Sequence, residues 1–488
     1  MSGANLILAI DQGTTSTRAI AFDLALRPVA SATRPLESVH PRAGWVEQDP
    51  DTILASIEDS VAEVLVAVGG PDRISCVGLD NQGETVVAWD AETGRALAPA
   101  IVWQCRRSLA IVERLAAAGH GAAIRSLTGL PLDPYFSAGK MTWLLENHPP
   151  VAAAARDRTL RLGTVDAWLT AHLGERGPMT DPSTASRTQL FGLRSLAWEP
   201  DLLSLFGVDP SWLPDIRSTT GDLGSFAGLR LTALACDQQA ALAGHGAFHV
   251  GAVKATYGTG VFVLANAGAR RDPAPGLEVS IAWRIGDEPA ASLLQGGVLT
   301  AGALLDWLTD ELTIVASAAE TETLAAAVTD SGDVRFLPAL SGLGAPWYRP
   351  AARAVIGGLT LSTRREHVVR AALDGIAQRT CDIVEAVVDA TGHAPPSLRV
   401  DGGLSANRWL MQRQADLLGF PVEVMFAGES TALGIAGLAG IGAGLLDVST
   451  IAAANPVAAR FEPTLSAGDR SRERADWRRF VEVSAGLG

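Results

Sequence analysis

A segment near the start of the chain has the residue types that bind a polyphosphate. Residues 11–18 read DQGTTSTR, an acid and a glycine that are followed by four hydroxyl side chains and an arginine. A turn of this composition can direct backbone N–H groups, hydroxyls and a guanidinium toward phosphate oxygens, and Asp11 can hold Mg²⁺ directly or through water. The same residue types are common in ordinary hairpin turns. These residues alone therefore leave a phosphate site and a plain polar turn as alternatives.

Two later segments repeat parts of this pattern. Residues 256–260 read TYGTG and lie between two apolar runs, as the first turn does. Residues 400–407 read VDGGLSAN, where a predicted strand ends in two glycines and a helix is expected from Ser405, with Asn407 one turn along it. Paired glycines let the backbone approach a planar ligand closely. The pattern predicts two similar domains that face one nucleotide, with chance similarity between two hairpins as the alternative.

The elements that must position these turns are strands alternating with helices. Apolar runs predict strands in the first half, at 6–10, 19–22, 74–79 and 85–89. Apolar residues at helical spacing predict helices, at 51–68, 363–391, 405–418 and 430–446. This alternation indicates α/β domains, and 488 residues are too many for one core, so two large domains are expected. The last forty residues, alanine-rich and then arginine-rich, are predicted to form a surface segment.

Composition excludes several classes of partner. Hydrophobic residues make up 48% of the chain and charged residues 19%, as in an ordinary soluble protein, and the net charge is -14. This charge argues against a nucleic-acid surface and against attraction to anionic membranes. No stretch has the length of a membrane span, and no signal peptide is expected at the N-terminus. The four cysteines lack metal-ligand spacing, which predicts reduced thiols in a cytoplasmic protein.

Taken in order, the three glycine-containing segments resemble the two phosphate motifs and the adenosine motif of the sugar kinase, chaperone and actin ATPase superfamily. Within it the chain is similar to the FGGY carbohydrate kinases, and among them to the glycerol kinase group. The matching sequence segments are spread over most of the chain: GWVEQDP (44–50), AIVWQCRR (100–107), TGLPLDPYFSAGK (128–140), GTVDAWL (163–169), DPSTASRT (181–188), DQQAAL (237–242), TYGTG (256–260), SGLGAPW (341–347), RVDGGLSAN (399–407) and TALG (431–434).

This resemblance implies roles for individual residues. Asp237 would be the catalytic base that removes a proton from the acceptor hydroxyl. The acceptor pocket would use that aspartate with Glu84, Trp103, Tyr135, Gln238 and Phe262. The nucleotide would be bound by Thr14, Thr15, Ser16, Arg18, Thr259, Gly302, Gly403 and Asn407. Asp11 would bind Mg²⁺.

The resemblance also implies the fold and the reaction. The expected fold is α/β, with two ribonuclease H-like domains of the actin-like ATPase type, at 1–246 and 247–488, on either side of a cleft. The expected reaction is ATP- and Mg²⁺-dependent phosphorylation of a terminal hydroxyl of glycerol, giving sn-glycerol 3-phosphate, or of a related small polyol. A homo-oligomer, dimer or tetramer, is expected, with no nucleic-acid partner and no membrane insertion.

Some positions depart from the family pattern. Glycerol kinases carry an arginine that donates to the substrate hydroxyls where this chain has Gly83. Three explanations of this difference compete: a longer polyol or sugar fills the space of the missing side chain, another basic residue compensates for it, or glycerol binds weakly. Asp306 stands where a glutamine near the adenine is usual. The segment 224–230 lacks the glycine- and lysine-containing run that binds fructose 1,6-bisphosphate in enteric glycerol kinases, so no such control is expected.

Three other functions compete with this interpretation. The first is a kinase for a larger polyol or a ketose, which Gly83 would favour. The second is an actin- or chaperone-like ATPase, which would need no acceptor pocket. The third is a non-catalytic regulator that binds nucleotide or polyol, against which Asp11 and Asp237 argue.

Overall fold

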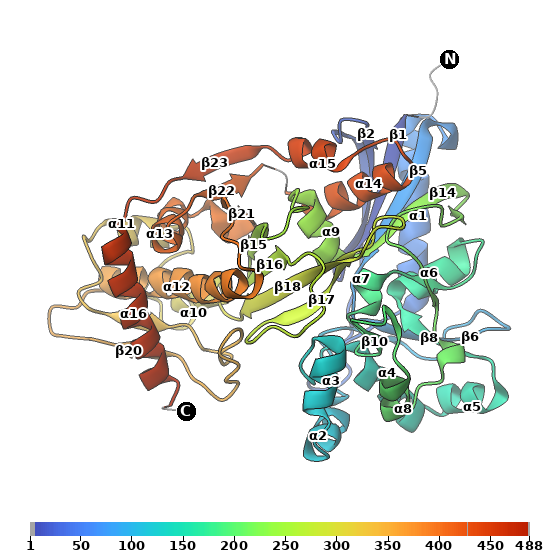
Figure 1. Ribbon diagram of the computed structural model, residues 1–488, viewed down its shortest axis with the longest axis horizontal. Helices are drawn as coiled ribbons and strands as arrows, with labels where there is room; N and C mark the ends of the chain where they lie inside the picture. Colours follow the sequence, from blue (N-terminus) through green and yellow to red (C-terminus); the bar gives the residue numbers. More distant parts are fainter. Residues whose placement is uncertain (1–4, 427, 487–488) are drawn as a thin grey trace.

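Two large mixed sheets, each in its own lobe, organise the molecule (Figure 1). The computed structural model describes residues 5–426 and 428–486. The first sheet has the order β13-β14-β5-β1-β2-β3. Its strands are β13 (Ser225–Phe226), β14 (Leu229–Cys236), β5 (Ile74–Asn81), β1 (Leu6–Gln12), β2 (Ser16–Asp23) and β3 (Pro28–Pro35).

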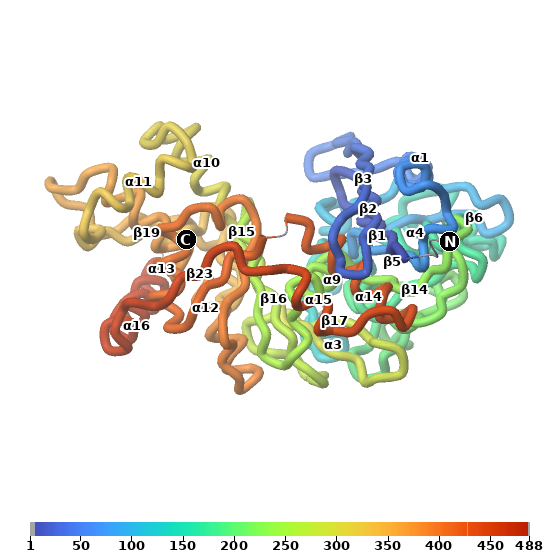
Figure 2. The backbone as a smooth tube through the Cα atoms, turned by 90° about the horizontal axis from the view of Figure 1, so that it is seen from above, coloured from blue at the N-terminus to red at the C-terminus, as the bar shows by residue number. Residues whose placement is uncertain are grey.

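The second sheet lies in the other lobe, which Figure 2 shows beside the first from above. It has the order β17-β18-β16-β15-β21-β22-β23. Its strands are β17 (Glu278–Trp283), β18 (Ala291–Val298), β16 (Val261–Asn266), β15 (Val253–Tyr257), β21 (Leu398–Asp401), β22 (Val422–Met425) and β23 (Val457–Phe461).

The two sheets share one core arrangement. Each begins with an antiparallel hairpin, β1–β2 or β15–β16, and the hairpin's first strand then pairs in parallel with a later strand, β5 or β21. A further parallel strand follows on the same side, β14 or β22. This repetition confirms the expected α/β fold with two ribonuclease H-like domains.

Helices cover both faces of the first sheet, which explains why β1 is continuously apolar. Leu6, Leu8 and Ile10 pack in one cluster with α1 (Pro50–Val68), while Ile7 and Ala9 pack in another with α9 (Asp237–Gly244) and α14 (Ser430–Gly442). Alternate residues of the strand therefore contribute to two different cores.

Helices α9 and α14 pack together with unusually close backbones. A Cβ at Gly434 would lie 1.8 Å from the Ala240 carbonyl oxygen, and a Cβ at Gly244 would lie 1.9 Å from that of Ser430. The apolar segment at 430–446 is thus part of a tightly packed helix pair, although its helix ends at Gly442. Helix α14 follows the second sheet's strands in sequence but packs on β1, β5 and β14 of the first (Figure 1). The predicted boundary at 246/247 falls between β14 and β15 and stays a prediction.

Other elements complete the two lobes. Next to the first sheet are a four-stranded sheet, β4 (Glu47–Gln48), β7 (Ala100–Ile101), β6 (Val86–Asp90) and β8 (Leu160–Thr164), and the helices α2 (Leu109–Ala117), α3 (Gly121–Thr128), α4 (Ser137–Asn147), α5 (Pro149–Asp157), α6 (Val165–Leu173), α7 (Pro182–Ala185) and α8 (Pro200–Phe206). The second half adds α10 (Gly302–Asp310), α11 (Glu320–Ala326), α12 (Arg365–Thr391), α13 (Arg408–Leu418), α15 (Val448–Ala454) and α16 (Ala467–Ser484).

Two expectations about the second half were wrong. The helix expected from Ser405 begins at Arg408, because Gly403–Ala406 forms a 3₁₀ turn and Asn407 caps α13 by accepting from the Leu410 N–H at 2.9 Å. The C-terminal segment is not purely a surface segment. Arg474 and Trp477 of α16 are buried, and Arg474 Nη2 donates to Asp382 Oδ1 at 2.6 Å.

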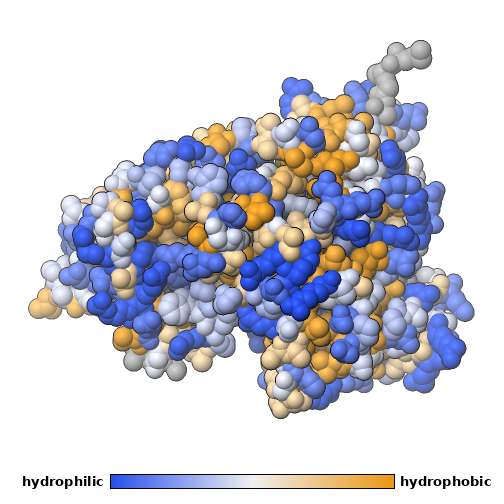
Figure 3. Space-filling view, viewed as in Figure 1, coloured by the Kyte–Doolittle hydropathy of each residue, from blue (hydrophilic) through white to orange (hydrophobic). Residues whose placement is uncertain are grey.

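The surface carries hydrophilic side chains over both lobes (Figure 3). Among the described residues, no helix combines the length and the apolar composition that crossing a membrane requires.

Candidate active site

Three carboxylates lie at the ends of neighbouring parallel strands. Asp11 of β1 is opposite Asp80 of β5 in the strand register, and Asp80 is opposite Ala235 of β14, two residues before Asp237. Because parallel strands end at the same edge of a sheet, their C-terminal residues meet there. The structure therefore brings together the residues predicted to be the metal ligand and the catalytic base. It adds Asp80, which the sequence analysis did not identify.

Asp237 is held at the first position of α9 and has a strongly shifted pKa. Its Oδ1 accepts from the Gln238 N–H at 2.6 Å. Burial, reinforced by the negative charge of Glu84, raises the pKa of Asp237 to about 7. A carboxylate with a pKa near neutrality is well suited to general-base catalysis.

A buried ion pair includes Glu84, one of the residues expected to bind the acceptor. Arg187 Nε donates to Glu84 Oε1 at 2.7 Å, and Arg187 Nη1 lies 3.3 Å from Glu278 Oε2 on β17. Both Glu84 and Arg187 are buried. The Arg187 guanidinium also lies 5.8 Å from the ring centre of Tyr135. Charged groups from both lobes are thus paired beside one aromatic ring.

Local structure holds these groups in place. Asp181 caps α7, accepting from the Thr184 N–H at 2.9 Å, and so fixes the turn that carries Arg187. Buried Lys140 donates to the main-chain carbonyls of Glu84 and Tyr135. Burial lowers the pKa of Lys140 to about 7.

Gly83 does not leave open space. A Cβ at this position would lie 2.5 Å from Cys236 Sγ and 3.6 Å from Arg187 Cγ. The thiol of the residue before Asp237 thus occupies the volume next to Gly83, and the Cγ methylene of Arg187 lies beside it. Of the three explanations for the missing arginine, this geometry argues against a longer acceptor in the space next to position 83.

The first turn connects the acceptor and donor sides. Trp103 Nε1 donates to Thr14 Oγ1 at 2.8 Å, and the Trp103 ring meets that of Tyr135 edge to face at 5.6 Å between centroids. Thr15 is exposed and Ser16 half-buried. Arg18 forms an ion pair with Glu429, just before α14.

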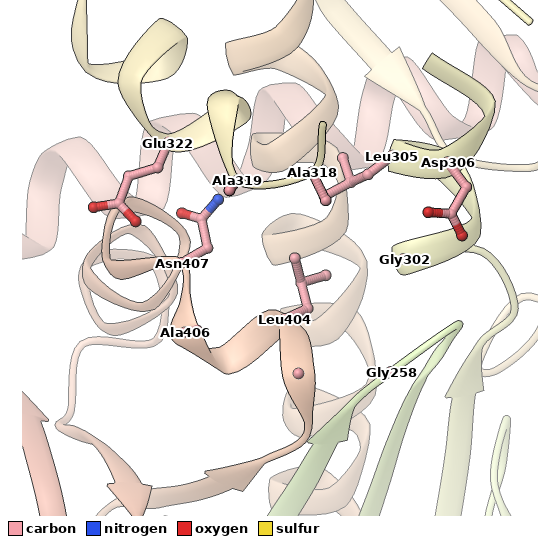
Figure 4. Close-up of a pocket in the computed structure, with 11 residues that line it drawn as sticks. Gly258, Gly302, Leu305, Asp306, Ala318, Ala319, Glu322, Leu404, Ala406 and Asn407 are labelled. Carbon is pink, nitrogen blue, oxygen red and sulfur yellow. The ribbon is translucent and has the colours of Figure 1, made fainter. Parts of the chain in front are cut away.

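A pocket of about 350 Å³ lies in the second lobe, where adenosine was expected. Its lining residues are Gly258, Gly302, Leu305, Asp306, Ala318, Ala319, Glu322, Gly403, Leu404, Ala406 and Asn407. Figure 4 shows the Asp306 and Glu322 carboxylates at opposite ends of it. The three residues predicted to line the adenosine site are among these. The Asn407 side chain is already engaged, because it caps α13 and donates to Thr321 Oγ1 at 3.1 Å.

Three predicted residues lie outside these groups of contacts. Thr259 is exposed at the tip of the β15–β16 hairpin, and its carbonyl accepts from the Ala301 N–H at 2.9 Å. Phe262 on β16 is 42% exposed. Gln238 is half-buried at the start of α9.

The sequence analysis assigned no role to Asp80, Arg187 or Glu278. Asp80 directly follows the apolar run of 74–79, as Asp11 follows that of 6–10, so the repeated strand-then-acid pattern was an available signal. Arg187 lies in a matched segment. Glu278 gave no local signal.

Comparisons with known proteins identify the family of the chain. Residues 6–234 of this chain match the N-terminal domain of the FGGY family of carbohydrate kinases, and residues 253–443 match the C-terminal domain of that family. A glycerol kinase of Citrifermentans bemidjiense is 45% identical over 491 residues, covering 98% of this chain and 99% of that protein. A glycerol kinase of Symbiobacterium thermophilum is 43% identical over 490 residues, covering 98% of each.

Solved structures of carbohydrate kinases also match the whole fold of this chain. Plasmodium falciparum glycerol kinase with ADP has a TM-score of 0.94 at 33% identity, covering 99% of this chain and 98% of that one. A xylulose kinase of Rhodospirillum rubrum has a TM-score of 0.88 at 26% identity, covering 98% of each. With both domain models and near-complete relatives matched, the chain belongs to the FGGY family of carbohydrate kinases.

Proposed function

We propose that this ATP-dependent kinase phosphorylates a terminal hydroxyl of glycerol, giving sn-glycerol 3-phosphate and ADP. The observation that carries the proposal is the position of Asp237. It is a carboxylate with a pKa of about 7, close to both the Glu84–Arg187 pair and the strand end that carries Asp11. Glycerol kinases that match nearly the whole chain support glycerol as the acceptor.

In this proposal the chain's own residues orient both substrates. Asp237 takes the proton of the attacking hydroxyl as the γ-phosphoryl group arrives in line. Glu84 and Tyr135 hold hydroxyls of the acceptor and Gln238 hydrogen-bonds to it, while the rings of Trp103 and Phe262 pack on its carbon chain. The side chains of both lobes are needed, so closure of the lobes over the substrates would exclude water.

The donor side would bind MgATP through the two hairpin turns and the pocket of the second lobe. Thr14, Thr15, Ser16, Arg18 and Thr259 would bind the phosphates, and Gly302, Gly403 and Asn407 would line the adenosine site. Asp11 would hold Mg²⁺, which neutralises phosphate charge when bound. The donor chemistry fits, because Mg²⁺ is typically held by one or two carboxylates together with phosphate and water oxygens.

Arg187 would supply the donor that Gly83 lacks. Its guanidinium is already oriented by Glu84 and Glu278, and an oriented charged donor can contribute several kcal/mol to discrimination between acceptors. The Cys236 thiol beside Gly83 supports glycerol over a longer acceptor, since it fills space that a longer chain would need.

Cytoplasmic location and a homodimeric or homotetrameric state belong to the same proposal. All four cysteines are buried free thiols, as expected in a reducing compartment. Light scattering during size-exclusion chromatography would show a single monomer peak if the oligomer were absent.

The test is a coupled ADP-release assay over glycerol, erythritol, other short polyols and ketoses. We expect the highest kcat/KM with glycerol. A higher value for a ketose or a longer polyol would transfer the proposal to that acceptor. Rates at the water background for every acceptor would overturn a kinase of small polyols altogether.

A further inference from the structure

Asp80 is a buried carboxylate without a hydrogen-bond donor. Its side chain is 0% exposed, and neither Oδ1 nor Oδ2 accepts from a hydroxyl, an amide or a backbone N–H among the described residues; the polar group facing it is the carboxyl of Asp11. Leaving a buried polar group unsatisfied costs about 1–3 kcal/mol, and more when it is charged. A carboxylate with two such oxygens therefore indicates a ligand that meets them.

Other buried carboxylates of the same lobe show how this protein normally satisfies such groups. Asp181 accepts from two backbone N–H groups and from the hydroxyls of Ser183 and Thr219. Asp166 accepts from Thr164 Oγ1 and from the Ala167 N–H through one of its oxygens. Hydroxyls and backbone N–H groups thus donate to the carboxylates of these two residues. Among the described residues, neither kind of donor is hydrogen-bonded to Asp80.

The neighbours of Asp80 are acidic. It is opposite Asp11 in the β1–β5 register and opposite Ala235 of β14, two residues before Asp237. Asp80 forms no ion pair among the described residues, and Arg18, the cation close to Asp11, is paired with Glu429. Among the described residues, the two facing carboxyls at this strand edge therefore have no cationic side chain paired with them to balance their charge.

A proton shared between Asp11 and Asp80 is one way to relieve that charge, and a divalent cation is the other. The cation accounts for more of the structure, because Asp11 begins the turn expected to receive the nucleotide's phosphates and Asp80 lies opposite it in the strand register. Within the part of the chain that the structure describes, no three His, Cys, Asp or Glu side chains are placed to hold a metal together. A pair of carboxylates completed by phosphates and water is the usual arrangement for Mg²⁺.

We propose that Asp80 and Asp11 together bind the divalent cation that enters with the nucleotide, each directly or through one water. This inference rests on the proposed function, since the nucleotide's phosphates supply the remaining ligands. Asp80 is then a second carboxylate of the metal site.

Metal binding without turnover tests the inference. Free Mn²⁺ is titrated by electron paramagnetic resonance into the full-length protein with saturating ADP and no acceptor. We expect Asp80→Asn and Asp80→Thr to raise the Mn²⁺ Kd about tenfold or more. The matched control is Asp166→Asn, which removes another buried carboxylate with one unpartnered oxygen and should leave the Kd within twofold. An unchanged Kd in the folded Asp80 variants would overturn the inference.

Asp11→Asn separates the two proposals. If it weakens Mn²⁺ binding and the Asp80 variants do not, only the present inference fails. If neither changes the Kd, the metal assignment within the proposed function fails as well. If circular dichroism shows that both Asp80 variants are unfolded, the metal position is determined instead from the anomalous scattering of Mn²⁺ in crystals of the wild-type ADP complex. A peak bonded or water-bridged to both carboxylates supports the inference, and one reaching Asp11 alone refutes it.

Discussion

The donor and acceptor sides of this site are built on different principles. The donor side consists of short glycine-containing turns at the surface: Thr15 and Thr259 are exposed, and a Cβ at Gly403 would meet nothing within 4 Å. The acceptor side consists of buried charged side chains that already bind one another, as Arg187 binds Glu84 and Glu278.

This difference reflects what each side must recognise. A polyphosphate is bound by any set of converging N–H groups and hydroxyls, so short glycine-containing turns suffice. A small polyol offers only hydroxyls and a short carbon chain, so its recognition needs donors and acceptors fixed before it arrives. The acceptor side should therefore be sensitive to single substitutions that leave nucleotide binding unchanged.

The largest expected effect comes from Asp237→Asn. We expect kcat to fall about 10²–10⁴-fold, because the amide cannot take the proton of the acceptor hydroxyl. Affinity for ADP, measured by calorimetry, should stay close to that of the wild type, because Asp237 is not among the residues expected to bind the nucleotide. Asp215→Asn, at an exposed aspartate of the same lobe, is the control. A loss of less than tenfold would show that Asp237 is not the base.

Arg187→Lys tests whether the acceptor side depends on a fixed guanidinium. Lysine keeps the charge but loses the fork that meets Glu84 and Glu278 together. We expect the KM for glycerol to rise about 10–100-fold, corresponding to the loss of a charged hydrogen bond, with a smaller change in kcat. Arg217→Lys, at an exposed arginine paired with Asp215, should leave the KM unchanged. A KM within twofold of wild type for Arg187→Lys would make Arg187 a purely structural residue.

The same contrast explains how much could be predicted from the sequence. The donor side is local: strand, turn and returning strand are contiguous, so the apolar run before Asp11 and the hydroxyls after it predict the hairpin, while phosphate binding and a plain polar turn stay open as its role. The paired hairpins and the alternation of strands with helices likewise predict the two-domain fold. Asn407 was misplaced because capping by its side chain competes with helix continuation over a few residues.

The acceptor side depends on contacts between distant residues. The sequence shows that Gly83 lacks a side chain, but not that Cys236 lies against it. It shows an acid at position 80, but not that the acid is buried without a donor. These facts follow from the parallel pairing of β5 with β1 and β14, which no local pattern reports.

The pH profile provides a third test. Since burial and Glu84 raise the pKa of Asp237 to about 7, the base is mostly protonated in mildly acidic solution. We expect kcat/KM to fall about tenfold for each pH unit below 7 and to level off above it. For stability the sign is opposite: the folded carboxyl holds its proton more tightly than the unfolded chain, so its stabilising contribution is lost as pH rises through 7. A flat rate profile between about pH 5.5 and 8 would contradict the assignment.

The smallest expected effect concerns the matched pair Gly83 and Cys236. A Cβ at position 83 would come within 2.5 Å of the thiol, so Gly83→Ala should lower the free energy of unfolding by about 1–3 kcal/mol. Adding Cys236→Ala should recover at least about 1 kcal/mol of that loss, since the two changes act on one contact. Urea denaturation measures both. Gly121→Ala, where a Cβ would meet nothing within 4 Å, is the matched control and should be nearly neutral.

The sign of this coupling decides what Gly83 means for the acceptor. Strong coupling would show that the thiol firmly occupies the space, so an arginine restored at position 83 would fail unless Cys236 were also reduced in size. Additive effects would show that Cys236 moves aside freely. The space would then be available to a longer polyol or sugar, and the acceptor side would be as adaptable as the donor side instead of preorganised for one small substrate.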